Sequence, residues 1–244
     1  MELKAVSLAA LLLLLSDLRP AGAGAAYTLH YFAARGKAEP IRLLLNELQL
    51  DYTEIRYTRP PVTGNMMNWE EEKPEGIASG LFPFGQLPVL THIHRPVLLQ
   101  QGKEGGVVSM AQSGAIMNYI GRQHSMYGKD IFQDMRIDEM IGGIGDLKAK
   151  WRDRFYGKET AEDLAAALLL WREEVPTWLS FIGTLKKKHG GRWMVGDELT
   201  LADFYAFEAL DGAMRYALPR LLSHLVTSPD LSFSRTFSAA WSEV

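Results

Sequence analysis

The hydrophobic pattern changes near residue 130, and this change limits the chain to a fold with two differently built parts. Before it, strand-like stretches alternate with helical repeats, beginning with a strand at residues 27–32 and a helix at residues 40–50. After it, residues 131–217 contain helical repeats only. Strands mixed with helices in one part and helices alone in the other predict a small mixed sheet with packed helices, followed by an all-helical domain.

The remaining elements follow from the same two periods. In the first part we expect further strands at residues 51–57, 87–93 and 107–108 and a helix at residues 109–122. In the second part we expect helices at residues 137–155, 161–188 and 201–218. Pro176 should kink the middle one, because proline has no backbone N–H to donate within a helix.

Composition narrows the class of protein. Of the 244 residues, 47% are hydrophobic and 23% charged, which is typical of globular proteins. The length suits two domains, which we expect at residues 27–124 and 130–244. The formal net charge of −3 gives no basic excess, so we expect no nucleic-acid partner.

The first 26 residues read as a leader rather than as part of the fold. Lys4 precedes an apolar run at residues 5–15, and small residues fill 21–26, which is the layout of a secretory signal peptide. The run is too short to cross a bilayer, so we expect no membrane span in the mature chain. A real leader places the protein in the secretory pathway or outside the cell. The alternative is a start codon assigned too early, and then the protein is cytoplasmic.

The chain contains no cysteine, which excludes disulfides and a thiolate nucleophile of its own. Any thiol chemistry must therefore use a thiol from outside the protein. His92 and His94 share a strand face, but a zinc site needs at least three protein ligands and no third is near in sequence. We therefore expect no metal.

Three short motifs occur in order in the first part: "YFAARGKAEPIR" from Tyr31, "FGQLP" from Phe84 and "AQSGAIMNYI" from Ala111. Together they resemble the cytosolic glutathione transferase family, in particular its tyrosine-type classes (sigma, pi and mu). The resemblance extends from Tyr27 to about residue 218. It implies an α/β thioredoxin-like N-terminal domain, an all-α C-terminal domain, a homodimer, and reduced glutathione as co-substrate with a hydrophobic electrophile.

Tyr31 matches the catalytic tyrosine of that family. A free thiol has a pKa near ~8.5, and lowering it by about 2 units requires about 2.7 kcal/mol of preference for the thiolate. One charge-assisted hydrogen bond contributes roughly 1.5–3 kcal/mol, so a single phenol hydroxyl is about sufficient. The alternative is that Tyr31 is one of the many strand aromatics that serve packing.

The resemblance also implies a set of glutathione-binding residues. In the "GQLP" motif, Gln86 and Leu87 precede a cis proline, and Leu87 pairs through its backbone with the cysteinyl part. Gln112 and Ser113 open a helix, whose free N–H groups suit the γ-glutamyl carboxylate. Ser113 could equally be a helix cap.

Three further positions complete this set. In "WEEEK", Trp69 and Lys73 are four residues apart and match a sigma-class pair that holds the glycyl carboxylate. Asp146 matches an aspartate that reaches the glutathione amine across the dimer interface, although a solvated helix carboxylate is an equal alternative. Lys37 stands where the family has arginine, so the charge is kept and the bidentate fork is lost.

For the electrophile we expect Phe32 and Tyr156, although helix packing explains Tyr156 equally well. Two other functions stay open. One is a glutathione-dependent isomerase, like the prostaglandin synthases of the sigma class, which uses the same glutathione site. The other is a non-catalytic structural relative, like the lens crystallins of the family. Lastly, "GDELTLADFYAF" predicts a capping box between Thr200 and Asp203, which serves folding rather than catalysis.

Overall fold

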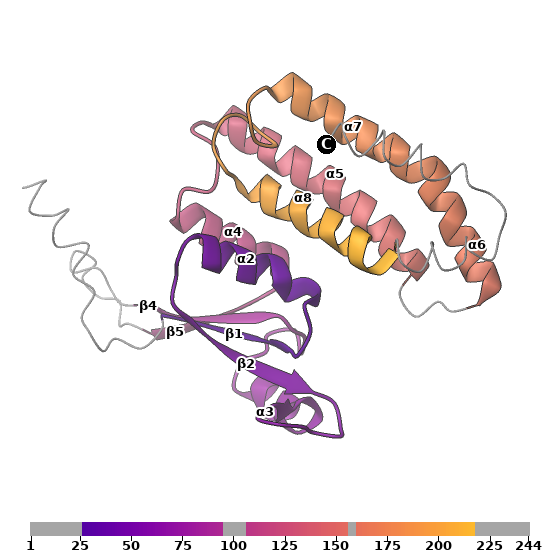
Figure 1. The fold of residues 1–244 in the computed structure, drawn as a ribbon. Coiled ribbons are helices and arrows are strands. Elements are labelled where there is room, and N and C mark those ends of the chain that lie inside the picture. The colour runs from indigo at the N-terminus through magenta and orange to yellow at the C-terminus, as the bar shows by residue number, and fades with distance from the viewer. Residues whose placement is uncertain (1–25, 95–105, 156–159, 218–244) are drawn as a thin grey trace, which may run out of the picture. The chain divides into compact units, whose positions relative to one another are not determined.

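The computed structural model describes residues 26–94, 106–155 and 160–217, which form two compact units (Figure 1). One unit holds the described residues of Met1–Ala34 and Gln49–Gln112, and the other those of Arg35–Leu48 and Ser113–Val244. All strands of the described residues belong to the first unit, and the second is built of helices. The predicted leader, apart from Ala26, lies outside the described residues.

The first unit is a five-stranded mixed sheet in the order β3-β2-β1-β4-β5. Its strands are β1 (Tyr27–Phe32), β2 (Tyr52–Thr58), β3 (Met67–Asn68), β4 (Val89–His94) and β5 (Gly106–Ala111). The central strand β1 is parallel to β2 and antiparallel to β4, and β5 is antiparallel to β4. Helix α3 (Trp69–Ala78) follows β3 directly. Strand β1 is therefore paired with β2 along one edge and with β4 along the other.

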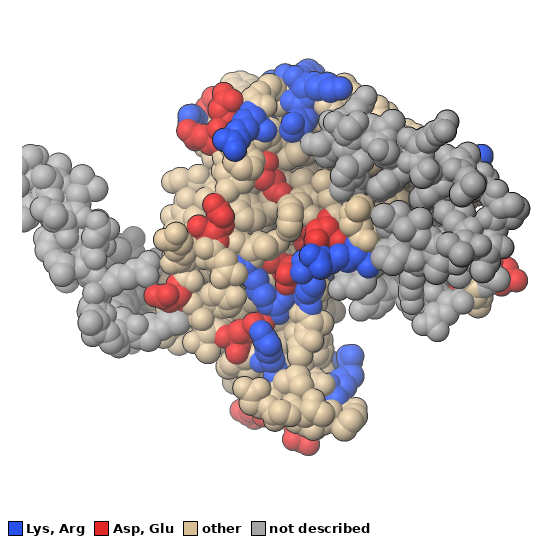
Figure 2. Space-filling model, in the orientation of Figure 1, with Lys and Arg blue, Asp and Glu red and all other residues tan. Residues whose placement is uncertain are grey.

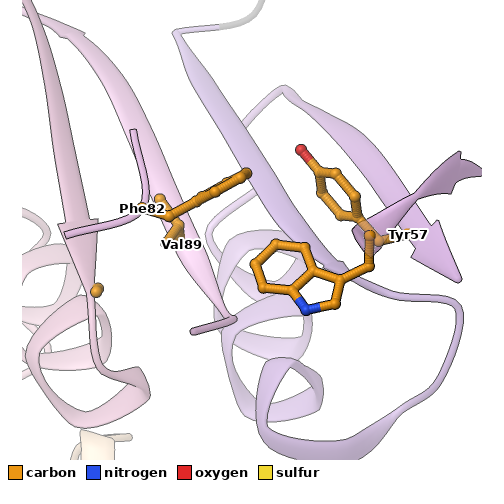
Figure 3. Close-up of a cluster of buried hydrophobic side chains, with 5 residues drawn as sticks. Tyr57, Phe82 and Val89 are labelled. Carbon is orange, nitrogen blue, oxygen red and sulfur yellow. The ribbon is translucent and has the colours of Figure 1, made fainter. Parts of the chain in front are cut away.

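One face of this sheet carries an aromatic core. It contains the buried side chains of Tyr57, Trp69, Phe82, Val89 and Ala111 (Figure 3). Successive residues of a strand point to opposite faces, so His30 and Phe32 of β1 face this core and Tyr31 faces away from it. The ring contacts agree, because Phe32 packs against the core and the ring of His30 lies 6.1 Å from that of Phe82.

The helical unit begins with a short turn, Gly36–Ala38, and helix α2 (Glu39–Glu47). Its other helices are α4 (Ser113–Gln123), α5 (Ile131–Phe155), α6 (Ala161–Leu169), α7 (Val175–His189) and α8 (Leu201–Gly212). The long helix α5 packs against α6, α7 and α8, while α2 packs against α4 and α8 (Figure 1). None of the helices in the described ranges is both long and apolar enough to cross a membrane.

The predicted elements are mostly confirmed, with two corrections. The strand at 27–32 is confirmed, but the helix expected from residue 109 begins only at Ser113. Residues 109–111 instead belong to β5, because Ser109 and Ala111 pair with Thr91 and Val89 of β4. The helix expected at 161–188 is divided by a π-helical turn, Leu170–Glu174, just before Pro176. Pro176 has no backbone N–H to donate, which is compatible with the change from α-helical to π-helical hydrogen bonding in the turn before it.

The predicted capping box is confirmed. The Asp203 carboxylate accepts the backbone N–H of Thr200 at 2.8 Å and the hydroxyl of Thr200 at 3.1 Å. It also accepts the backbone N–H of Met194 at 2.8 Å. One side chain therefore fixes both the start of α8 and the loop that leads into it.

Candidate functional site

The pairing of the strands brings several predicted site residues to one end of the sheet. His30 pairs with Val89 across β1 and β4, so one further step along this register sets Pro88 beside Tyr31. Val89 also pairs with Ala111 of β5, the residue before Gln112. Segments far apart in the sequence thus bring Tyr31, the "GQLP" motif and Gln112 to the same end of the sheet.

The other half of the sheet ends at the same level. Phe32 pairs with Tyr57, and the N–H of Ala33 donates to the Tyr57 carbonyl at 3.0 Å. Thr58 pairs with Asn68 in the parallel ladder of β2 and β3, and Arg59 and Trp69 follow this last pair in the chain. The carboxyl ends of parallel strands are a common location for binding sites in α/β proteins.

Tyr31 lies near the end of β1 with only 8% of its surface exposed. Its ring is edge-on to that of Phe32, with 5.9 Å between the ring centres. Backbone pairing to β2 on one side and to β4 on the other fixes the strand that carries it. Its side chain therefore projects from a rigid part of the sheet.

The "GQLP" segment enters β4 through a cis peptide bond between Leu87 and Pro88. Gln86 is exposed, and Leu87 is partly buried against the aromatic core. Packing of the Leu87 side chain fixes the direction in which its backbone groups point.

Gln112 occupies the turn between β5 and α4 and has a φ angle of 71°. This left-handed conformation is uncommon for residues other than glycine, and such strain tends to persist where function requires it. Gln112 is exposed, and Ser113 is the first residue of α4. Ser113 therefore stands at a helix N-terminus, where free backbone N–H groups favour an anion.

Trp69 and Lys73 share a face of α3, as their spacing predicts. The helix begins at Trp69, and the Asn68 side chain caps it by accepting the backbone N–H of Glu70 at 3.1 Å. The Lys73 ammonium lies 5.9 Å from the centre of the Trp69 ring, within range of a cation–π interaction. Trp69 is only 3% exposed, so the indole is part of the aromatic core as well as a neighbour of Lys73.

The remaining predicted residues belong to the helical unit. Lys37 is exposed in the turn Gly36–Ala38, and Asp146 is exposed on α5. Next to Lys37, Arg35 forms ion pairs with Asp211 of α8 at 2.6 Å and with Glu39 at 3.2 Å. Tyr156 lies outside the described residues.

The structure adds a buried polar pair that the sequence did not indicate. His30 is 4% exposed, and its Nδ1 lies 3.0 Å from the Tyr57 hydroxyl. Burial lowers the pKa of His30 from 6.5 to about 4. Burial, followed by the charge of Glu72, raises the pKa of Tyr57 to about 12. The pair is therefore neutral at physiological pH. In the sequence, the only feature that could have pointed to His30 is its position next to Tyr31.

A second addition is Arg59, whose guanidinium lies 5.3 Å from the centre of the Phe32 ring. It also forms an ion pair with Glu70 at 3.1 Å. On the face shown in Figure 2, acidic and basic side chains are interspersed over the surface. Arg59 and Lys73 each lie beside an aromatic ring at this end of the sheet, a kind of contact that other cations of the described residues also make.

Comparison with known proteins decides the family. The chain is 34% identical to Glutathione S-transferase 2 of Gallus gallus over 186 residues, which covers 75% of this chain and 74% of the relative. The chain belongs to the glutathione S-transferase family. It is also 30% identical to Glutathione S-transferase P 10 of Caenorhabditis elegans over 184 residues, covering 75% of this chain and 73% of the relative. Residues 145–232 match the glutathione S-transferase C-terminal domain.

A solved glutathione S-transferase structure confirms the fold. The sigma-class enzyme of Fasciola hepatica matches with a TM-score of 0.64 and 25% identity, covering 90% of this chain and 97% of that one. The predicted fold, a thioredoxin-like domain followed by a helical domain, is therefore confirmed, as is the enzyme class of glutathione transferase.

Proposed function

We propose that this glutathione S-transferase conjugates reduced glutathione to hydrophobic electrophiles, and that Tyr31 stabilises the reacting thiolate. The observation that carries the proposal is that the segments containing Tyr31, Pro88 and Gln112 all lie at one end of the sheet. His30 pairs with Val89, and Val89 pairs with Ala111, and these three paired residues directly adjoin Tyr31, Pro88 and Gln112 in the chain. A tripeptide bound across this end can meet all three segments at once.

In this mechanism the Tyr31 hydroxyl donates a hydrogen bond to the glutathione sulfur. The bond favours the thiolate over the thiol, which raises the fraction of the nucleophile present at neutral pH. The thiolate attacks the electrophilic carbon, a carbon–sulfur bond forms, and the leaving group departs with its electron pair.

Each part of glutathione has a proposed partner. The Leu87 backbone, with Gln86 beside it, pairs with the cysteinyl residue. Gln112 and Ser113 receive the γ-glutamyl end, which is supported by the helix N-terminus at Ser113. Lys73, positioned over Trp69, receives the glycyl carboxylate.

The roles of the remaining residues are further parts of this proposal. Lys37 adds positive charge for the peptide, and Asp146 of one protomer binds the glutathione amine held by the other in a homodimer. Phe32 and Tyr156 contact the electrophile. Sequence similarity to dimeric family members supports these assignments, together with the exposure of Lys37 and Asp146, which leaves both within reach of a ligand.

The test compares the parent enzyme with Tyr31→Phe in the conjugation of glutathione to a generic aryl halide. Loss of the hydrogen bond should lower kcat at least about tenfold and raise the apparent pKa of the bound thiol, while calorimetry still shows glutathione binding. Tyr52→Phe is the matched control, because Tyr52 pairs with Tyr27 at the opposite end of β1 and should keep full activity.

Two outcomes would contradict the proposal. Full activity of Tyr31→Phe would mean that another group stabilises the thiolate. A parent enzyme that binds glutathione without consuming it would favour the isomerase or the structural function instead.

A further inference from the structure

We propose that Arg59 is a second cation for the glycyl carboxylate of bound glutathione, acting beside Lys73. The inference rests on the proposed function and identifies a residue that neither the motifs nor the resemblance indicated. Arg59 follows β2 in a segment whose sequence, "RPPVTGN", reads only as a loop. Three observations support the assignment.

The first observation is backbone position. The parallel register of β2 and β3 pairs Tyr57 with Met67 and Thr58 with Asn68. This pair ends the ladder, so Arg59 and Trp69, the first residue of α3, each follow its last pair directly in the chain. Arg59 therefore leaves the sheet at the same place as the helix that carries Lys73.

The second observation is a pair of aromatic rings with a cation on each. The Phe32 and Trp69 rings meet edge to face with 5.6 Å between their centres. The guanidinium of Arg59 lies 5.3 Å from the Phe32 centre, and the ammonium of Lys73 lies 5.9 Å from the Trp69 centre. Each cation is held by a ring, so both are positioned before a ligand binds.

The third observation is the charge around α3. Its first turn contains three acidic residues, Glu70, Glu71 and Glu72. Lys73 alone is outnumbered by these carboxylates, which repel an approaching carboxylate ligand. A second cation from outside the helix offsets part of this repulsion.

Arg59 is able to supply that charge. Its ion pair with Glu70 is 3.1 Å long, but the two side chains are 68% and 55% exposed. Exposed pairs of this kind contribute little to stability, so the guanidinium can exchange Glu70 for a ligand at small cost. Its planar fork can also bind a carboxylate through two parallel hydrogen bonds.

The experiment measures the affinity of two probes by calorimetry: glutathione and its glycyl ethyl ester, which lacks the negative charge. Arg59→Gln should raise the Kd of glutathione about two- to fivefold, the range for exposed ion pairs, and leave the Kd of the ester unchanged. Arg56→Gln is the matched control, because Arg56 lies on β2 three residues before Arg59, is 59% exposed and pairs with Glu54 at 3.1 Å. It should change neither affinity.

The variant Glu70→Gln distinguishes two roles of Arg59: direct contact with the ligand carboxylate, and neutralisation of the charge of Glu70. If Arg59 binds the carboxylate, Glu70→Gln should tighten glutathione, and Arg59→Gln should weaken it again in that background. The proposed contact would be overturned if Arg59→Gln did not change the Kd of glutathione in the Glu70→Gln background. It would also be overturned if Arg59→Gln changed the Kd of glutathione and of the ester equally, or changed neither. A parent that binds neither probe would refute the proposed function itself.

Discussion

The buried His30 should make this enzyme lose stability in mild acid. Its pKa is about 4 in the folded chain, because burial penalises the charged imidazolium, against 6.5 for an ordinary histidine. Protonation therefore favours the unfolded chain. The contribution of His30 is complete above about pH 6.5 and is lost as the pH falls from there toward 4.

The magnitude follows from the two pKa values. Each pH unit between about 6.5 and about 4 removes about 1.4 kcal/mol, so the total loss is about 3 kcal/mol. This is a large part of the roughly 5–15 kcal/mol by which native proteins are stable. His124 and His189 also have pKa values lowered by burial, so they steepen the same decline.

The assay is urea unfolding followed by tryptophan fluorescence at several values between about pH 7 and about pH 4.5. The variant His30→Gln removes the titrating group and keeps an amide for the Tyr57 hydroxyl, which lies 3.0 Å from His30 Nδ1. Its free energy of unfolding should fall about 2 kcal/mol less than that of the parent over this range, because the assay ends above the folded pKa of about 4. His92→Gln, a change on the neighbouring strand, should decline in parallel with the parent.

Two results would refute this reasoning. The first is a His30→Gln variant that loses as much stability in acid as the parent does. The second is an NMR titration in which the imidazole of His30 protonates near its ordinary pKa. Either result would mean that the sheet opens around His30 before the proton is bound.

Three further predictions concern stability and can be checked by chemical denaturation. Gly76→Ala should cost at least about 1–3 kcal/mol, because the new Cβ would lie 2.0 Å from the Phe82 ring in the core. Gly142→Ala is its counterpart on α5 and should stabilise the chain by up to about 1 kcal/mol, because no atom lies within 4 Å of the new Cβ. If Gly142→Ala instead lowers the stability, and lowers it more at lower protein concentration, a second protomer covers this face of α5. Asp203→Ala should cost about 2 kcal/mol by removing the acceptor for Thr200 and Met194, whereas an unchanged midpoint would mean that water replaces it.

Local sequence was enough to predict β1 and the order of most elements, but not β3 and α3, which lie in the stretch between β2 and β4 that was predicted as loop. The aromatic run that ends before Gly36 has the composition of a strand, and its limits are the observed ones. It was not enough at residues 109–111, because their apolar spacing also fits a helix. Their state is decided by pairing with β4, about twenty residues earlier in the chain. Such long-range pairing cannot be read from a short window of sequence.

In the functional site, too, local sequence predicted some features, and others depend on contacts that only the fold creates. The spacing of Trp69 and Lys73 predicted a shared face, and the structure confirms it. That Trp69 is also a core residue depends on Tyr57 and Phe82, which only the folded sheet brings to it. Arg59 was missed for a similar reason, since its ring partner Phe32 is distant in the sequence.

The way in which the sheet end is assembled has a consequence for how such enzymes diverge. Tyr31, Pro88 and Gln112 come to one end of the sheet because each is the neighbour in the chain of a residue that is paired in the sheet. Exchanging one strand side chain for another of similar shape leaves that count unchanged. Inserting or deleting a single residue would turn the following side chains to the opposite face. Strand length, more than strand sequence, should therefore be what descendants of this protein inherit unaltered.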